Sequence, residues 1–120
     1  MKNRLRQTGA FTLVEIMIVV AIIGMLATIA IPNYVKVRTE AQKTTCIQNL
    51  RTIDGAIQEW ALEQKKDAGQ TVTHADLRVY LRSAVACPSG GTTLEDSYTV
   101  TSVDARPSCR RKPDTHLLPL

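Results

Sequence analysis

Aromatic residues are scarce in this sequence of 120 residues, where they make up 4% of the chain. Because aromatic side chains bury the largest areas in a core, we expect no large core around a deep substrate pocket. The sequence also lacks internal repeats, low-complexity tracts and a Gly-rich phosphate-binding loop. The length allows one small domain. These absences argue against a self-contained enzyme.

Positive charge is concentrated at the start of the chain. Lys2, Arg4 and Arg6 contribute three of the 15 basic residues, so 12 basic side chains face 11 acidic ones in the remainder. The net charge of +4 therefore does not indicate nucleic-acid binding.

One long apolar run follows these basic residues. Phe11 to Ile31 form 21 residues whose only charge is Glu15. As a helix this run would rise about 32 Å, enough to cross a hydrocarbon core of about 30 Å. The basic residues before it favour a cytoplasmic N-terminus. A plain membrane anchor and a secretory signal cleaved after Ala30 are alternative interpretations, but neither explains Glu15.

Glu15 is the informative residue of the run. A carboxylate at the centre of a membrane helix costs about 2.5–3.5 kcal/mol and calls for a cationic partner. The run contains no Lys, Arg or His. The partner would come from another copy of the chain, or from an amine created by cleavage before Phe11. Alternatively, the Glu15 side chain reaches the lipid headgroups.

The segment GAFTLVEIMIVVAIIGMLATIAIPNY resembles the N-terminus of type IV pilins and type II secretion pseudopilins. The resemblance implies that a prepilin peptidase cuts between Ala10 and Phe11 and methylates the new amine of Phe11. It also implies that Glu15 pairs with the amine of a neighbouring subunit, and that Gly24 and Pro32 soften the helix. In the family a Gly usually precedes the cut, whereas here Ala10 takes that place.

We expect an α+β, pilin-like fold with three parts: a leader (1–10), a transmembrane and assembly helix (11–32), and an amphipathic helix with an extracytoplasmic head (33–120). Pro32 predicts a kink or local melting near 28–32. A second helix is predicted from Asn33 to Ala68, with Gly69 as its C-terminal stop. An apolar stripe at helical spacing should form its core face: Cys46, Leu50, Ile53, Ile57 and Trp60.

The head itself is predicted from local patterns. Thr73 and Asp76 have capping-box spacing, which predicts a short helix over 74–82. A turn is expected over 87–91. Two alternating segments, 92–94 and 98–103, predict a small antiparallel β element joined by residues 95–97. The last segment, 104–120, has three prolines and no period, so we expect an irregular wrap or tail.

Three cysteines in an extracytoplasmic head suggest one disulfide and one free thiol. We favour a bridge between Cys87 and Cys109, which encloses 21 residues and would stabilise the head by about 3 kcal/mol. Cys46 lies on the core stripe and is expected to be a buried thiol. A bridge from Cys46 to either of the others is the alternative.

No cofactor is expected, with one weak alternative. The resemblance to secretion pseudopilins suggests calcium near the C-terminus, where Glu95, Asp96 and Asp104 offer carboxylates. However, the spacing D-x-D-x-D-G is missing, and acidic turn residues are more often solvated. Zinc-ligand spacing is missing around both His74 and His116, so the spacing predicts no zinc.

We interpret the chain as a structural subunit of a type II secretion pseudopilus or a type IV pilus-like filament, and not as an enzyme. It would be a single-pass protein of the bacterial inner membrane, with the assembled filament periplasmic or extracellular. The resemblance implies as partners further copies of the chain, prepilin peptidase, a platform protein, a cytoplasmic ATPase and membrane lipid. The alternative is a membrane-tethered binding module that does not polymerise.

The surface of this alternative module would be a basic cluster near the C-terminus. It consists of Arg106, Arg110, Arg111 and Lys112. Such a cluster attracts DNA or anionic sugars, but no aromatic stacking platform accompanies it. A solvated tail is the simpler interpretation, and nucleic acid is not an expected partner.

The intact mass of the protein extracted from membranes tests the processing prediction. We expect a chain that starts at a methylated Phe11. A chain that starts at Met1 would leave only an anchored module, and one that starts at Ile31 would be a secreted domain. Either result would contradict the filament interpretation.

Overall fold

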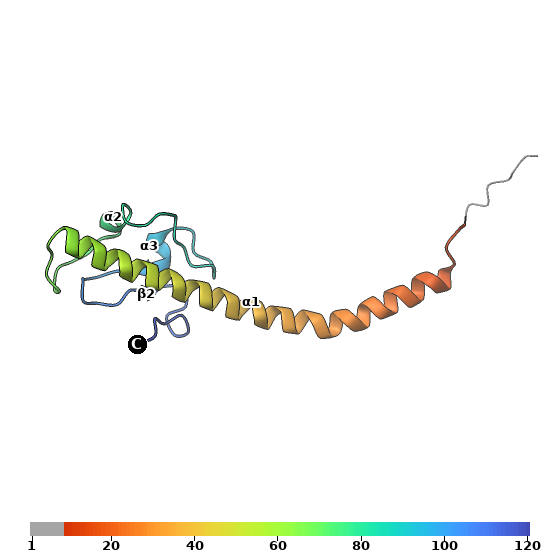
Figure 1. The fold of residues 1–120 in the computed structure, drawn as a ribbon. Coiled ribbons are helices and arrows are strands. Elements are labelled where there is room, and N and C mark those ends of the chain that lie inside the picture. The colour runs from red at the N-terminus through yellow and green to blue at the C-terminus, as the bar shows by residue number, and fades with distance from the viewer. Residues whose placement is uncertain (1–8) are drawn as a thin grey trace, which may run out of the picture. The chain divides into compact units, whose positions relative to one another are not determined.

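The computed structural model describes residues 9–120. The chain divides into two compact units, Met1–Val37 and Arg38–Leu120. Helix α1 (Leu13–Glu63) contributes to both of them (Figure 1). Most of the predicted leader, residues 1–8, lies outside the described residues.

The second unit is the head, which is built around the C-terminal part of α1 (Figure 1). Its other elements are two single-turn helices and two short strands: α2 (His74–Leu77), α3 (Leu94–Ser97), β1 (Tyr98–Thr99) and β2 (Ser108–Cys109). The predicted α+β class, with a long helix and a small head, is confirmed.

Within the first unit, α1 continues through Pro32 without interruption. Of the two predicted alternatives near 28–32, local melting is therefore wrong, and the kink stays a prediction. Proline removes only one intrahelical hydrogen bond, the one that Thr28 C=O would accept. The hydroxyl of Thr28 donates to Gly24 C=O at 2.8 Å.

The C-terminus of α1 falls at Glu63, and the predicted stop at Gly69 is wrong. Lys66 N–H donates to Ala61 C=O at 2.8 Å, and Lys65 N–H donates to Leu62 C=O at 3.4 Å. Lys65 has φ 52°. These features form a Schellman motif with a lysine, in place of the usual glycine, in the left-handed position.

The predicted core stripe of α1 is confirmed. All five predicted residues are buried, and the same face also buries two alanines: Cys46, Leu50, Ile53, Ala56, Ile57, Trp60 and Ala61. The rest of the head covers this face with buried residues from loops and short elements: Val72, Leu77, Val85, Cys87, Leu94, Tyr98, Val103 and Cys109. The core is therefore one layer of loops and short elements on one helix.

Helix α2 has the predicted capping box but is shorter than predicted. The hydroxyl of Thr73 accepts from Asp76 N–H, and the Asp76 carboxylate accepts from Thr73 N–H. The helix ends at Leu77, whose C=O accepts from Tyr80 N–H and Leu81 N–H at 3.0 Å each. Leu77 is buried, and Tyr80 and Leu81 pack against the core, so the predicted shared face is confirmed.

The predicted β element is only partly correct. Residues 92–94 are not a strand, and the predicted connection 95–97 belongs to α3, which Thr93 and Asp96 cap. Strand β1 pairs with β2, with Tyr98 opposite Cys109. β2 lies in the segment predicted to be irregular. An additional antiparallel bridge joins Thr71 to Ser102.

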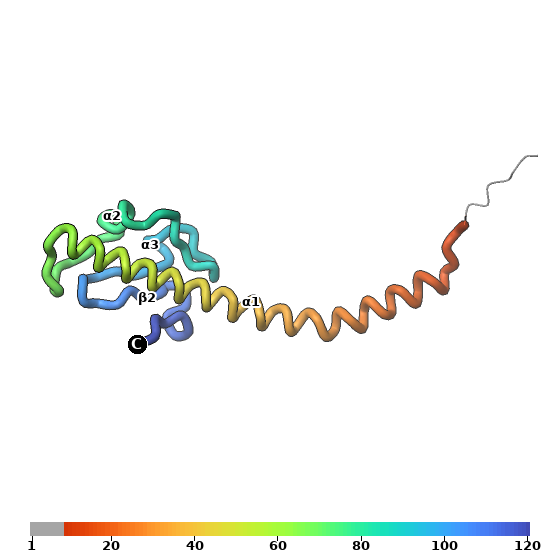
Figure 2. Tube along the Cα trace, in the orientation of Figure 1, coloured from red at the N-terminus to blue at the C-terminus, as the bar shows by residue number. Residues whose placement is uncertain are grey.

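After β2 the C-terminal segment makes a loop and ends near α1 (Figure 2). The last residues, including Pro119 and Leu120, line a shallow surface hollow together with Arg51 and Asp54 of α1. Within this segment His116 is buried, and its N–H donates to Lys112 C=O at 3.0 Å. The predicted tail therefore contributes a buried side chain to the head.

The left-handed residue at the end of α1 gives a stability prediction. For Lys65→Gly we expect a gain of about 1 kcal/mol, because a residue with a Cβ is strained at positive φ and glycine is not. Thermal unfolding of the full chain in detergent measures this gain. The control Lys66→Gly should destabilise instead, because the Lys66 ammonium lies 5.9 Å from the centre of the Trp60 ring. An unchanged or lower midpoint for Lys65→Gly would contradict the prediction.

Candidate functional site

Two groups of residues in the described chain combine unusual chemistry with a defined position. The first is the start of α1. Thr12 N–H donates to the Glu15 carboxylate at 2.9 Å, and Glu15 N–H donates to the Thr12 hydroxyl at 3.3 Å. This reciprocal pair is a capping box, and it places a negative charge at the positive end of the helix dipole.

The capping box gives Glu15 a partner within its own chain. The sequence predicted a cationic partner for the Glu15 carboxylate. In the structure the Thr12 N–H is its partner within the chain. A carboxylate offers about four acceptor positions, and the cap uses one of them. The group can therefore cap its own helix and also pair with a cation from outside.

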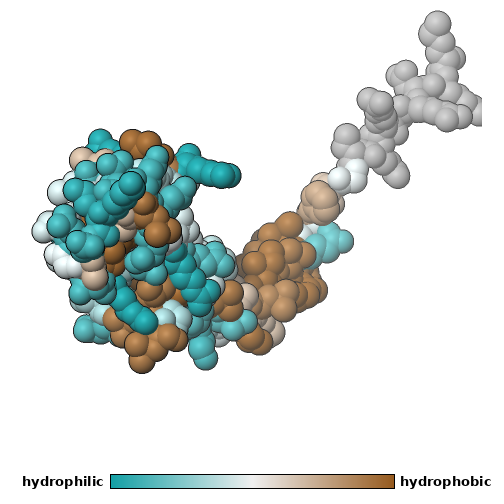
Figure 3. All heavy atoms as spheres, turned by 60° about the vertical axis from the view of Figure 1, so that its left-hand side comes forward, coloured by the Kyte–Doolittle hydropathy of each residue, from teal (hydrophilic) through white to brown (hydrophobic). Residues whose placement is uncertain are grey.

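Side chains along the first unit's part of α1 are apolar and exposed. The most apolar 18-residue window of α1 has no buried residue in the structure, and Figure 3 shows a nearly continuous hydrophobic surface on this helix. Phe11 is 85% exposed and Ile29 is 76% exposed. An apolar surface of this extent marks contact with a membrane or with other protein chains.

The second group lies inside the head. It consists of Cys46 from α1, Cys87 from the loop before α3, Cys109 from β2 and His116 from the C-terminal segment. Their exposed fractions are 0%, 1%, 1% and 3% respectively. One ligand atom from each residue lies within 4.8 Å of the other three.

The distances within this group are short. Cys87 Sγ lies 3.6 Å from Cys109 Sγ, and each of these sulfurs lies 3.9 Å from His116 Nδ1. The two cysteines predicted to form a disulfide are therefore neighbours, and both are free thiols in this structure. Their bridge stays a prediction, and so does the bridge from Cys46.

A chain of hydrogen bonds fixes the position of Cys46. Asn49 Nδ2 donates to Tyr98 Oη at 3.0 Å, and Tyr98 O–H donates to Cys46 Sγ at 3.6 Å. Asn49 also donates to Ala86 C=O at 3.0 Å, next to Cys87. Burial raises the pKa of the Cys46 thiol to about 12, although the Tyr98 hydrogen bond acts in the opposite direction. Burial, together with the charges of Lys112 and Lys43, lowers the pKa of His116.

A tight turn shapes the backbone around Cys87. Gly90 has φ 103°, and Gly91 N–H donates to Cys87 C=O at 2.8 Å. A Cβ at Gly91 would lie 2.0 Å from Ser97 Oγ and 2.8 Å from Cys87 N. Gly90 is therefore needed for its positive φ, and Gly91 is needed for the close approach of the backbone beside Cys87.

The three carboxylates considered for calcium have other partners. Glu95 pairs with Arg78 at 2.5 Å, and Asp104 accepts from the Ser102 hydroxyl at 2.7 Å. Asp96 caps α3 and pairs with Arg111 at 3.1 Å. Within residues 9–120, these three do not gather into a group with ligand atoms close enough to share an ion.

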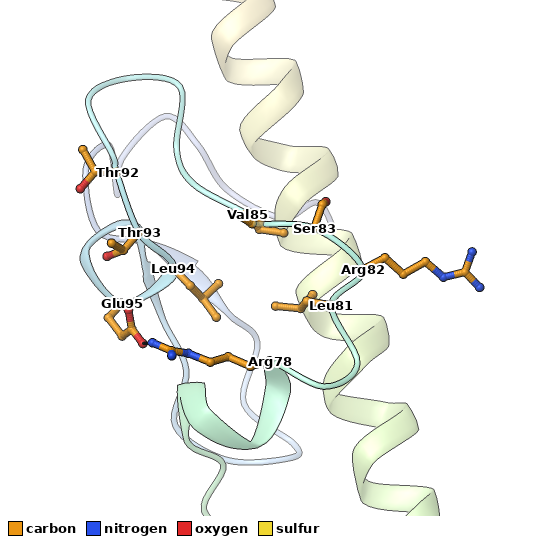
Figure 4. A pocket seen from close by; sticks show the side chains of 10 residues that line it. Arg78, Leu81, Arg82, Ser83, Val85, Thr92, Thr93, Leu94 and Glu95 are labelled. Carbon is orange, nitrogen blue, oxygen red and sulfur yellow. Dashed lines mark hydrogen bonds and ion pairs between the residues drawn. The ribbon is translucent and has the colours of Figure 1, made fainter.

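One hollow on the head has a largely apolar surface. Figure 4 shows that Leu81, Val85 and Leu94 line it, while Arg78 and Glu95 point toward each other across one end. Because these two charges neutralise each other, the hollow presents no unpaired charge from them to a ligand.

The basic cluster predicted as an alternative surface is partly used within the chain. Arg111 pairs with Asp96, and Arg106 donates to Pro119 C=O at 3.1 Å. These contacts hold the C-terminal segment against the head.

Comparison with known proteins supports the pilin-like interpretation of the N-terminal segment. The family model described as the prokaryotic N-terminal methylation motif matches residues 5–31. The type IV major pilin protein PilA of Myxococcus xanthus is 51% identical over 43 residues, which are 36% of this chain and 20% of that protein. The resemblance to pilins and pseudopilins is confirmed.

Two further relatives extend the pilin-like similarity beyond the motif. Fimbrial protein Q of Moraxella bovis is 36% identical over 102 residues, which cover 71% of this chain and 65% of that protein. The type II secretion system core protein G of Klebsiella pneumoniae is 34% identical over 61 residues, 51% of this chain and 43% of that protein. The chain thus spans 20% to 65% of the length of these three relatives. No solved structure gives a significant match.

The sequence of this pilin-like chain predicted an N-terminal site, which stays a prediction, and did not predict the group in the head. Cys87 and Cys109 are 22 positions apart, and Cys109 and His116 are seven apart. Such spacings do not have the short paired form of common zinc motifs. The available signal was that Cys46 lies on the core face of α1, where thiols from covering loops can meet it.

The carboxylate of Asp96 gives a pH-dependent prediction. Hydrogen bonds from the Thr92 and Ser97 hydroxyls hold the pKa of Asp96 far below its usual value. A depressed pKa in the folded state stabilises the fold at pH values above the unfolded pKa of about 3.9, and this contribution is lost as the pH falls. Asp96→Asn should therefore lower the thermal midpoint at pH 7, and the difference from the unchanged chain should narrow below about pH 4.

Thermal unfolding of the full chain in detergent from pH 7 to pH 3 measures this effect. Asp67→Asn, at an exposed position after α1, is the matched control and should have little effect at any pH. An equal loss of stability for Asp96→Asn at pH 7 and pH 3 would show that the carboxylate charge is not what stabilises α3.

Proposed function

We propose that this chain is the structural subunit of a type II secretion pseudopilus, cleaved between Ala10 and Phe11 by prepilin peptidase and methylated at the Phe11 amine. The subunit is held in the inner membrane with its N-terminus toward the cytoplasm. It then joins a helical homo-oligomer, driven by a platform protein and a cytoplasmic ATPase. The methylation motif and the similarity to pilins and to protein G support a pilin-like filament subunit.

The observation that carries the proposal is the exposed apolar face of α1 from Leu13 onward. Leaving this surface in water costs about 25 cal/mol for each Å² of apolar area. A bilayer removes it from water while the subunit is stored. A bundle of identical helices removes it after assembly. One helix can therefore serve both states without changing its fold.

Glu15 supplies the specificity that a purely apolar helix lacks. In a bundle, apolar helices can slide past one another with little change in energy. A buried carboxylate that must meet the Phe11 amine of a neighbour restricts the bundle to one register. The methylated amine remains cationic, so the pairing survives the modification.

A surface pilus is the second candidate, and one observation favours it. The similarity to fimbrial protein Q covers 71% of this chain, whereas the similarity to protein G covers 51%. The small head favours the secretion filament. The internal contacts of Arg106 and Arg111 favour it too, because they leave fewer basic side chains to bind the anionic partners of an adhesive pilus. The same contacts weaken the alternative of a tethered, non-polymerising module.

A pair of substitutions at Glu15 separates the role of its charge from the role of its cap. Glutamine at this position still completes a capping box, but it cannot form an ion pair with an amine. We therefore expect Glu15→Gln to lose filaments almost as completely as Glu15→Ala. Both variants should remain in the membrane and should be cleaved normally.

The measurement is filament yield in cells that produce each variant, with exported proteins and surface attachment assayed in the same strains. Thr12→Ala, which removes only the hydroxyl of the cap, is the matched control and should leave filament yield high. Normal filaments from Glu15→Gln would show that capping alone explains Glu15. Loss of attachment with normal export would identify a surface pilus.

A further inference from the structure

The four residues Cys46, Cys87, Cys109 and His116 have no part in the proposed assembly by α1. They come from four separate segments of the head, and all are buried. Three thiols and one imidazole make up one of the common ligand sets of structural zinc sites. We propose that these residues bind one Zn²⁺ ion, which holds the head together.

The distances agree with tetrahedral coordination. With Zn–S bonds of about 2.3 Å, the sulfurs of a tetrahedral site lie about 3.8 Å apart. The separation of Cys87 Sγ and Cys109 Sγ is 3.6 Å, and each lies 3.9 Å from His116 Nδ1. Cys46 Sγ completes a group in which no two ligand atoms are more than 4.8 Å apart. Adjustments of less than about 1 Å bring all four to bonding positions.

The charges around the group suit the bound state. On binding, the three thiols release three protons to solvent, and three thiolates with a neutral imidazole give the site a net charge of −1. Lys43 and Lys112 are close enough to act electrostatically on His116. Their positive charges would partly neutralise the net negative charge of the zinc site. Tyr98 O–H donates toward Cys46 Sγ, and hydrogen bonds of this kind commonly orient the ligands of zinc sites.

A Cys87–Cys109 disulfide would explain the positions of fewer of these four buried residues than a bound metal ion would. It would use two of the four groups and would leave a buried thiol and a buried imidazole beside it. Histidine is rarely buried without a polar role. The turn around Gly90 and Gly91 and the pairing of Cys109 with Tyr98 place both thiols where Cys46 and His116 can join them.

All four coordination positions are filled by protein, which is typical of a structural site and not of a catalytic one. The ligands are sulfur and nitrogen, so calcium and magnesium, which require oxygen, are excluded as occupants. The proposal does not depend on the filament, because the site would stabilise the head of a tethered module equally well.

The test is the metal content of the full chain, purified in detergent without added metal or chelator, together with its intact mass. We expect about one zinc ion per chain and no change in mass on reduction. Exchange into Co²⁺ should give the absorption bands of tetrahedral cobalt bound to thiolate. This spectrum uses the unaltered chain, so it decides the matter even where a variant fails to fold.

Cys46→Ser and His116→Ala should each lower the zinc content to a small fraction of one ion per chain. Tyr98→Phe keeps all four ligands and should weaken zinc binding about 10- to 100-fold. His74→Gln replaces the chain's other histidine, which lies outside the group, and should leave the zinc content unchanged.

A metal-free chain that gains two hydrogens on reduction would overturn the proposal in favour of the disulfide. So would full zinc content in His116→Ala, or a cobalt spectrum without thiolate bands. None of these results bears on filament formation, which is tested separately by the filament yield of the Glu15 variants.

Discussion

The head depends on one packing interaction, the contact between the buried stripe of α1 and the loops that cover it. The stripe from Cys46 to Ala61 supplies seven of the buried core residues, and the other elements are too short to form a core among themselves. α2 and α3 each have four residues, and the sheet has two strands of two residues. A sheet this small is not stable in isolation, so the covering segments fold only against the helix.

This arrangement explains why capping and turn chemistry are so frequent in the head. Each short element ends almost as soon as it begins, so its backbone groups need partners from side chains. Thr73 with Asp76, and Thr93 with Asp96, meet this need at the two single-turn helices. Glu15 and Thr12 repeat the same device at the start of α1. Capping is thus used in both units, at the apolar start of α1 and in the head.

Patterns within single segments were predictable from the sequence, and contacts between distant segments were not. The stripe of α1 and the capping box at Thr73 follow from spacing alone. The end of α1 was misplaced because Lys65 takes a left-handed conformation for which the sequence offers no glycine. β2 was missed because two residues carry no detectable alternation, and pairing with Tyr98 is decided by the fold. The thiol and imidazole group was missed for the same reason, since each ligand comes from a different segment.

The distribution of these ligands has a consequence for how the head folds. Bringing the loop before α3, β2 and the C-terminal segment onto α1 closes several loops, and each closure costs chain entropy. A domain with so small a core has little hydrophobic energy to offset that cost. A bridge between Cys87 and Cys109 would close one loop and would not link the C-terminal segment to α1. A single ion bound by Cys46, Cys87, Cys109 and His116 would fasten three segments to α1 at one point, and it would require no oxidant. The position of Cys46 on the core stripe is then explained, because it ties the metal to the helix on which the whole head is built.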